Sequence, residues 1–236
     1  METSFEFKHF AIEHYRATMK VGTDAVLLGA WVDVGNAKAI LDVGTGSGVI
    51  ALMMAQRSGV ASHIDAVEPH GASAMQAIEN VNKSPWPEKV QVHPTSIQKF
   101  QSEVLYDLIV SNPPYFNNSL LPPTQDRQVA RHTETLTFDD LLVAVKRLLD
   151  PNGAFAVVLP VNEGNLFREQ AGQYGLSCHR SMAFYSRKEK QQERWLMEFS
   201  FAGKQKEVNS EKVILYEDGD QWTERYAALM REFYLR

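Results

Sequence analysis

The chain has 236 residues, a formal net charge of −5, 44% hydrophobic residues and a single cysteine, Cys178. This length suits one large α/β domain with a real core. One cysteine excludes an internal disulfide framework and a cysteine-rich zinc site, and it is typical of a protein in a reducing cytoplasm. The negative charge argues against indiscriminate binding to nucleic acid, but it does not exclude a local basic face.

Two further classes of protein are not expected. The longest apolar runs, such as residues 49–55, are too short to span a bilayer, and the N-terminus lacks the pattern of a secretory signal. The seven histidines are scattered and none lies in a metal-binding pair such as HExxH. We therefore expect a cytoplasmic protein with no membrane span and no metal.

From residue 39 to residue 174, short apolar runs alternate with amphipathic runs. This alternation predicts a parallel sheet with helices on both faces. Thr137 is the expected N-cap of one helix, and Asp150-Pro151-Asn152-Gly153 is an expected turn. Strands are expected at 39–43, 64–67, 90–93, 105–111 and 154–159, and helices at 49–57, 72–82, 138–149 and 165–174.

The last third of the chain has a different pattern. Strand-like runs at 176–186, 194–201 and 213–216 follow one another with little helix between them, and a helix is expected at 223–233. This order predicts an antiparallel edge on the otherwise parallel sheet. We expect one domain over 1–236, made of an N-terminal cap (1–38), a cofactor-binding and catalytic core (39–160) and a C-terminal part (161–236).

A glycine-rich loop, LDVGTGSG (41–48), joins the first core strand to the first core helix. Glycines at alternate positions allow backbone conformations closed to other residues and a close approach to a ligand. The helix that follows presents N–H groups to polar or anionic ligand groups. Glu68 ends the next strand about 20 residues further on, where an acid can accept hydrogen bonds from ribose hydroxyls. The loop and Glu68 together predict a nucleoside site.

The spacing of the glycines indicates which nucleoside cofactor is bound. The dinucleotide fingerprint GxGxxG would place its third glycine at Val49, so a nicotinamide oxidoreductase is disfavoured. The pattern is GxGxG with Gly44, Gly46 and Gly48, preceded by Asp42, and it resembles the S-adenosylmethionine loop of class I methyltransferases. The alternative is a glycine-rich turn that binds no ligand.

The second motif is IVSNPPYF (109–116), at the end of an apolar strand. Pro113 and Pro114 cannot continue a sheet, and each forces the residue before it into an extended conformation. Asn112 is therefore held rigidly, next to the ring of Tyr115. On these residues alone, a strand that simply ends in a turn is an equal alternative.

Together, GxGxG after one strand and NPPY after a later strand resemble the amino-methyltransferases, which methylate planar exocyclic or amide nitrogens. The resemblance implies a seven-stranded, Rossmann-like class I fold with S-adenosylmethionine as cofactor. It also implies that the Asn112 side chain and the Pro113 carbonyl accept hydrogen bonds from the target NH₂, that Pro114 completes the motif, and that Tyr115 stacks on the target.

A closer resemblance covers nearly the whole chain. The segments MKVGTDAVLLGAW (19–31), LDVGTGSGVIALMMAQR (41–57), SNPPYF (111–116) and FYLR (233–236) are similar to those of the bacterial tRNA1(Val) (adenine-N6)-methyltransferase family. This implies N6-methylation of adenine 37, next to the anticodon. It also implies that Lys20, Gly22, Thr23 and Asp24 close over the methionine part of the cofactor; the alternative for this segment is a turn packed on the sheet.

One position departs from the family pattern. Members carry an acid near the end of the third strand, where it reaches the cofactor adenine, but this chain has Ser96 there. Serine can accept a hydrogen bond but carries no charge, so cofactor affinity could be weaker. Ile97 would still pack on the face of the adenine.

Several basic residues are candidates for binding RNA phosphates. Arg131 follows the NPPY motif, and the family resemblance favours it. Four more lie in the C-terminal part, interleaved with aromatic residues; the alternative is a solvated loop, because Glu189 and Glu193 dilute the charge. We expect charge reversal at Arg187 and Lys188 to weaken tRNA binding. The four candidates are Arg180, Arg187, Lys188 and Lys190.

Three alternative functions remain at this point. A protein glutamine N5-methyltransferase shares both motifs, but such enzymes carry a sizeable N-terminal helical domain and the first core strand here begins near Ala39. Adenine in rRNA or DNA cannot be separated from adenine in tRNA by spacing and chemistry. A non-catalytic RNA-binding module is disfavoured by the intact NPPY motif. The sequence does not reveal the oligomeric state, and of the possible states a monomer is slightly favoured.

Overall fold

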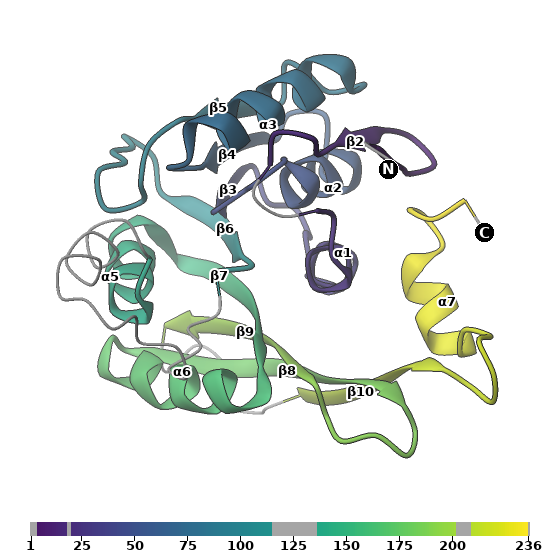
Figure 1. Cartoon of the computed structure of the whole chain (residues 1–236). Helices are drawn as coiled ribbons and strands as arrows, with labels where there is room; N and C mark the ends of the chain where they lie inside the picture. Colours follow the sequence, from purple (N-terminus) through teal and green to yellow (C-terminus); the bar gives the residue numbers. More distant parts are fainter. Residues whose placement is uncertain (1–3, 18–19, 115–135, 202–208, 236) are drawn as a thin grey trace, which may run out of the picture.

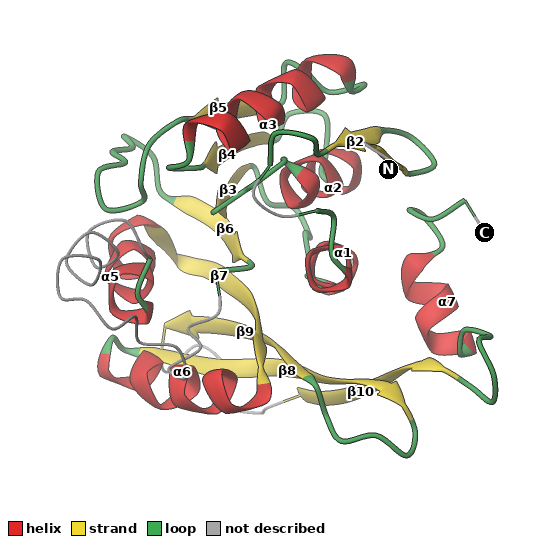
Figure 2. Ribbon diagram, viewed as in Figure 1, coloured by secondary structure: helices red, strands yellow, loops and turns green. Residues whose placement is uncertain are grey.

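The fold is built on one central sheet with helices on both faces (Figure 1, Figure 2). The computed structural model describes residues 4–17, 20–114, 136–201 and 209–235. Within these residues the sheet has eight strands. In spatial order they are β10 (Asn209–Tyr216), β8 (Leu176–Arg187), β9 (Arg194–Phe201), β7 (Leu149–Pro160), β6 (Tyr106–Ser111), β3 (Ala39–Val43), β4 (His63–Val67) and β5 (Val90–His93).

The helices and a short hairpin complete the described elements. Alternate residues of a strand point to opposite faces, so Ile40 packs in one core cluster and Leu41 in the other. The first cluster lies under α1, α2 and α7, and the second under α5 and α6 (Figure 1). The elements are β1 (Ser4–Glu6), β2 (Ala11–Glu13), α1 (Thr23–Trp31), α2 (Val49–Arg57), α3 (Gly71–Lys83), α5 (Phe138–Leu148), α6 (Val161–Gln173) and α7 (Glu224–Met230).

The C-terminal strands differ from expectation in direction. The eight strands of the sheet in the described residues match the eight strand-like runs of the sequence, whereas the family resemblance implied seven. β9 is antiparallel to both β7 and β8, whereas β10 is parallel to β8. The single reversed strand is therefore β9, inside the sheet, and the outermost strand β10 runs with the core strands. Hydrophobic patterns identify strands, but they do not reveal this order.

The starts of α5 and β7 can also be compared with what the sequence predicted. Thr137 caps α5 through a capping box, in which its side chain and that of Asp140 bind each other's backbone N–H. The expected turn at Asp150 lies inside β7, because Tyr106 pairs with Leu149 and Leu108 already pairs with Ala154. The residues between Leu149 and Ala154 bulge out of the ladder.

Candidate active site

The glycine loop and the NPP segment leave the sheet side by side. Val43, the last residue of β3, pairs with Ser111 of β6 and with Val67 of β4. Ser111 Oγ also donates a hydrogen bond to the Val43 carbonyl oxygen over 2.9 Å. The residues that follow these three, Gly44, Asn112 and Glu68, therefore leave the sheet next to one another. The strand order reverses at β3, and such a switch point is where open α/β sheets bind their ligands.

The three glycines of the loop adopt conformations that favour glycine. Gly44, Gly46 and Gly48 have φ of +76°, +58° and +90°. A Cβ built on Gly44 or Gly46 would meet nothing within 4 Å, so open space lies beside this part of the loop. A Cβ on Gly48 would lie 3.5 Å from the Cβ of Ala77, so the end of the loop packs on α3. The loop thus has an open side and a packed side.

Asp42 holds the loop from below and is fully buried. Its Oδ2 accepts hydrogen bonds from Thr45 Oγ1 (2.6 Å) and from the Ala51 N–H (3.0 Å). Its Oδ1 is buried and has no partner among the described residues. Burial, with a smaller contribution from the nearby Glu68 charge, raises the pKa of the Asp42 carboxyl to about 7, although its hydrogen bonds from Thr45 and Ala51 act to lower it. Asp42 is therefore a buried acid with one unused acceptor next to the loop.

Glu68 holds the loop from the side. Its Oε2 accepts the Gly46 N–H and its Oε1 accepts the His70 N–H, both over 2.9 Å. The residue is only 8% exposed. These bonds place its carboxylate where the sequence predicted an acid, directly beside the open part of the loop.

The segment before α1 lies at the same edge of the sheet. Arg57, at the end of α2, donates to the carbonyl oxygens of Gly29 and Val32 at the end of α1 (2.8 and 2.7 Å). The C-terminal ends of the two helices therefore lie together. Asp24 Oδ2, in the first turn of α1, accepts from Arg194 Nε over 2.8 Å.

Arg194 also fixes the place of this segment, because it pairs with Pro160 at the C-terminal end of β7. The sequence did not reveal α1 or this ion pair. Thr23 and Asp24 begin the helix and Gly22 is its N-cap. Lys20, Gly22 and Thr23 are exposed at this edge.

The loop after β5 contains the two residues expected near the adenine. The Ser96 carbonyl oxygen accepts the N–H groups of Lys99 and Phe100, both over 3.0 Å. Ile97 is 3% exposed and belongs to the core cluster under α5. Because His93 pairs with Val67, this loop starts at the same edge as Glu68.

The NPP segment is described as far as Pro114. Asn112 is partly exposed, Pro113 is buried and Pro114 is exposed. Tyr115 and Arg131 lie outside the described residues. The structure thus places Asn112 and Pro113 at the site, next to the glycine loop.

The four C-terminal basic candidates fall into two groups. Arg180 stacks on Trp31 and pairs with Glu198 (3.5 Å) and Glu211 (3.3 Å). Arg187 pairs with an acid as well, across the loop that leads to α7; its Nη2 lies 2.9 Å from Asp220 Oδ1.

Lys188 and Lys190 form the second group. Both are exposed in the connection between β8 and β9. This connection follows Arg187 at the edge that carries the glycine loop, so the two lysines are the candidates that face solvent there.

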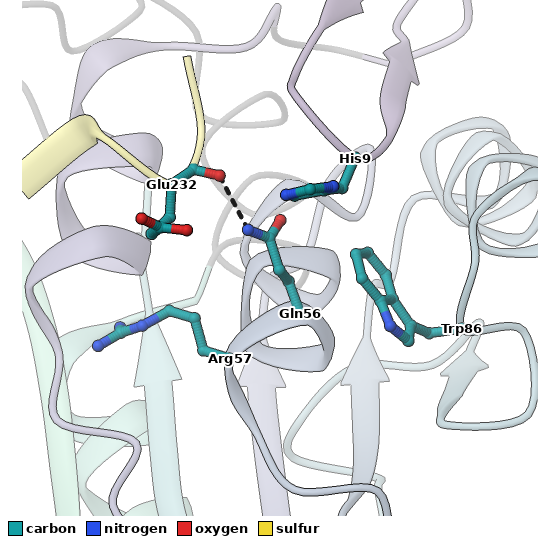
Figure 3. Close-up of a pocket in the computed structure, with 5 residues that line it drawn as sticks. All are labelled: His9, Gln56, Arg57, Trp86 and Glu232. Carbon is teal, nitrogen blue, oxygen red and sulfur yellow. Dashed lines mark hydrogen bonds between the residues drawn. The ribbon is translucent and has the colours of Figure 1, made fainter. Parts of the chain in front are cut away.

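The cavity drawn in Figure 3 is not part of this edge. It has a volume of about 460 Å³ and lies at the C-terminal end of α2, away from the glycine loop (Figure 3). Among the described residues, no group of three or more His, Cys, Asp or Glu side chains could hold a metal ion. None of the described helices has the length and apolar character needed to cross a membrane. The residues that line the cavity of Figure 3 are His9, Gln56, Arg57, Trp86 and Glu232.

Comparison with known proteins defines the class first. Residues 16–165 match the family model of the methyltransferase small domain. A crystal structure described as a predicted O-methyltransferase of Agrobacterium tumefaciens has the same fold, with a TM-score of 0.66 at 14% identity, covering 89% of this chain and 96% of that one. The mitomycin 7-O-methyltransferase has a TM-score of 0.53 at 15% identity, covering 76% and 53%. Both likenesses concern the fold alone.

The curated relatives are more specific. The tRNA1(Val) (adenine(37)-N6)-methyltransferase of Phocaeicola vulgatus is 42% identical, covering 98% of this chain and 97% of its own. The protein of the same name from Trichodesmium erythraeum is 45% identical, covering 98% of each chain. The chain therefore belongs to the tRNA1(Val) (adenine(37)-N6)-methyltransferase family.

Proposed function

We propose that the protein transfers the methyl group of S-adenosylmethionine to N6 of adenine 37, next to the anticodon of tRNA1(Val). One observation carries this proposal. The pairing of Val43 with Ser111 brings a GxGxG loop and an Asn-Pro-Pro segment to adjacent positions at the switch point of the sheet. Family membership supports the choice of substrate. The protein would act in the cytoplasm as a monomeric single domain over residues 1–236, with cap, core and C-terminal part as predicted.

The residues at this edge fit the cofactor. The space beside Gly44 and Gly46 would admit a ligand that a larger side chain would block. The Glu68 carboxylate suits the ribose hydroxyls, and the unused Oδ1 of Asp42 is a further buried acceptor. When bound, S-adenosylmethionine supplies a methyl group activated by a sulfonium. The full set proposed to hold it is Lys20, Gly22, Thr23, Asp24, Asp42, Gly44, Gly46, Gly48, Glu68, Ser96, Ile97 and Asn112.

The target amine needs positioning more than activation by a base. Its lone pair is delocalised into the adenine ring, so the amine is a poor nucleophile. The Asn112 side-chain oxygen and the Pro113 carbonyl would accept its two N–H bonds and aim the lone pair at the methyl carbon. Transfer of the methyl group would form the C–N bond as the C–S bond of the cofactor breaks, and the nitrogen would then lose its extra proton to solvent. Pro114 would restrict the segment, and Tyr115 would stack on the base.

The tRNA must approach this edge of the sheet with its target base unstacked. Lys188 and Lys190 are exposed there, and we propose them as phosphate contacts. Arg180 and Arg187 would act indirectly, by holding their strands through their acid partners. Arg131 stays a prediction from the family resemblance.

The test is methylation of total tRNA from a strain that lacks the gene, with radiolabelled S-adenosylmethionine and the Asn112→Ala variant as control. A parallel reaction contains release factor, which would be the substrate if the protein were a glutamine N5-methyltransferase. The expected result is label in N6-methyladenosine from a valine tRNA, and loss of that label with Asn112→Ala. Label in protein and none in RNA would overturn the proposal.

A further inference from the structure

Asn80 joins two segments that lie far apart in the sequence. It is a residue of α3 with 1% exposure. Its Nδ2 donates to the carbonyl oxygens of Ser47 and Glu13, each over 2.8 Å. Its Oδ1 accepts the Glu13 N–H over 3.0 Å. Both N–H donors of the amide are used, so the side chain holds one orientation.

The two partners belong to the glycine loop and to the N-terminal segment that leads to α1. Ser47 lies between Gly46 and Gly48 in the glycine loop. Glu13 ends β2, and the chain continues from it toward Lys20 and α1. Asn80 binds both backbone polar groups of Glu13, as a neighbouring strand would.

The glycine loop needs such a partner. Gly48 follows Ser47, so the peptide that links them has no Cβ on its C-terminal side and rotates more freely than one between two residues with side chains. One end of this peptide, the Gly48 N–H, donates to the Thr45 carbonyl oxygen over 2.9 Å. The other end, the Ser47 carbonyl, accepts from Asn80. The two bonds fix the peptide plane, and with it the direction of the open side of the loop.

A second amide of α3 provides a natural comparison. Gln76 lies one turn before Asn80 and is fully buried. Its Oε1 accepts the Arg16 N–H over 3.3 Å, so it also holds the N-terminal segment. Among the described residues, its other hydrogen bond runs from Nε2 to Glu79 Oε2 over 3.5 Å, on the same helix and not to the glycine loop. Asn80 and Gln76 therefore both hold the N-terminal segment, and Asn80 also binds the glycine loop.

We propose that Asn80 is a positioning residue that couples the N-terminal segment to the glycine loop. Cofactor affinity then depends on Asn80 although its side chain faces two backbone segments and not the open side of the loop. Residues 11–16 and the loop respond to the cofactor as one unit. This inference rests on the proposal that the glycine loop binds S-adenosylmethionine.

The test measures the Kd for S-adenosylmethionine by calorimetry in four proteins: the wild type, Asn80→Ala, Gln76→Ala and Gly46→Val. Loss of the buried bonds in Asn80→Ala raises the Kd about tenfold, whereas Gln76→Ala changes it less than about threefold. In steady-state kinetics, Asn80→Ala raises KM for the cofactor and leaves kcat at saturating cofactor unchanged. Asn80→Asp, which keeps the shape and the acceptor for Glu13 but lacks N–H donors, also raises the Kd.

Each variant tests a different part of the proposal: the role of Asn80, the cofactor site itself, or the coupling through Ser47. Wild-type affinity in Asn80→Ala together with lost binding in Gly46→Val overturns the role of Asn80 and leaves the loop as the site. Normal binding in Gly46→Val overturns the proposed site itself. An equal loss in Gln76→Ala overturns the coupling through Ser47, because that variant does not touch the loop.

A measurement on the wild type does not depend on how the variants fold. Hydrogen exchange is followed with and without saturating S-adenosylhomocysteine. The expected result is slower exchange in residues 11–16 as well as in residues 44–51. Protection confined to residues 44–51 would overturn the coupling.

Discussion

The cofactor edge and the C-terminal half of the sheet use their charged side chains in opposite ways. At the cofactor edge the acids bind backbone: Asp42 accepts the Ala51 N–H and Glu68 accepts the Gly46 N–H. In the C-terminal half the cations bind acids: Arg180 pairs with Glu198, and Arg194 with Asp24. The acids thus shape a loop that stays open to a ligand. Many of the cations are already neutralised and stabilise the fold.

The same contrast explains how far the sequence could be interpreted. At the cofactor edge, Asp42 and Ala51 are 9 residues apart and Glu68 and Gly46 are 22 apart, within one strand–helix–strand unit. In the ion pair of Arg194, Asp24 lies 170 residues away. A motif with its spacing describes the first kind of site, but counting basic residues overestimates the charge that is free for RNA.

The largest expected effect tests the cofactor edge. Asn112→Ala should lower kcat about 10²–10³-fold, because one of two acceptors that orient the amine is lost. Cofactor affinity should fall by a smaller factor than kcat, because Asn112 is one of several residues proposed to hold the cofactor and the glycine loop and Glu68 stay intact. Single-turnover methylation and calorimetry measure the two quantities. A variant that loses cofactor affinity but keeps kcat would place Asn112 in the cofactor site alone.

The second prediction concerns the buried acid of the same edge. The pKa of Asp42 is raised from 3.8 to about 7, so the folded state keeps a proton that the unfolded state loses above pH 4. This contribution to stability falls as pH rises from about 4 to about 7 and is constant above. Asp42→Asn is neutral at every pH, so its stability relative to wild type should rise by about 2–4 kcal/mol over this range.

Urea unfolding at a series of pH values measures this difference. Asp107→Asn is a suitable comparison, because Asp107 is exposed and its carboxylate also accepts two backbone N–H groups. Parallel curves for wild type and Asp42→Asn would contradict the raised pKa.

The third prediction turns to the C-terminal half. Arg180→Met should lower the free energy of unfolding by about 2–3 kcal/mol, because it removes a partner of Glu198, which is 6% exposed. Arg225→Met is the matched control: Arg225 pairs with the same Glu211 from a more exposed position and should cost less than about 0.5 kcal/mol. Equal losses in the two variants would remove the distinction between buried and exposed pairs.

The smallest expected effect concerns the two exposed lysines. Lys188→Glu combined with Lys190→Glu should weaken tRNA binding about tenfold, reduce its salt dependence and leave stability unchanged. Lys38→Glu combined with Lys146→Glu is the control, because these exposed lysines precede β3 and β7, at the opposite edge of the sheet. Filter binding at several salt concentrations compares the tRNA affinity of the two double variants. Equal weakening by both pairs would indicate a non-specific effect of charge.

Most of the core elements could be predicted, because their apolar residues follow a clear period. α1 could not, since all residues from Ala25 to Trp31 are buried and leave no polar face to mark a helix. The place of β10 beside β8 also depends on contacts that close only in three dimensions. In the site, Glu68 could be found from its spacing after the glycines, whereas Asn80 could not, because its partners come from β2 and from the loop.

The position of β9 between β7 and β8 has a consequence for synthesis. β8 precedes β9 in the chain, yet its sheet partner on the side of the core is β9. While the ribosome is still producing residues 161–193, the edge of β7 has no neighbouring strand, and Val157 to Leu159 lie along that edge. An open apolar edge of this kind invites pairing with other chains. The strand order therefore leaves the nascent chain open to wrong strand pairing in the interval between the emergence of β7 and that of β9.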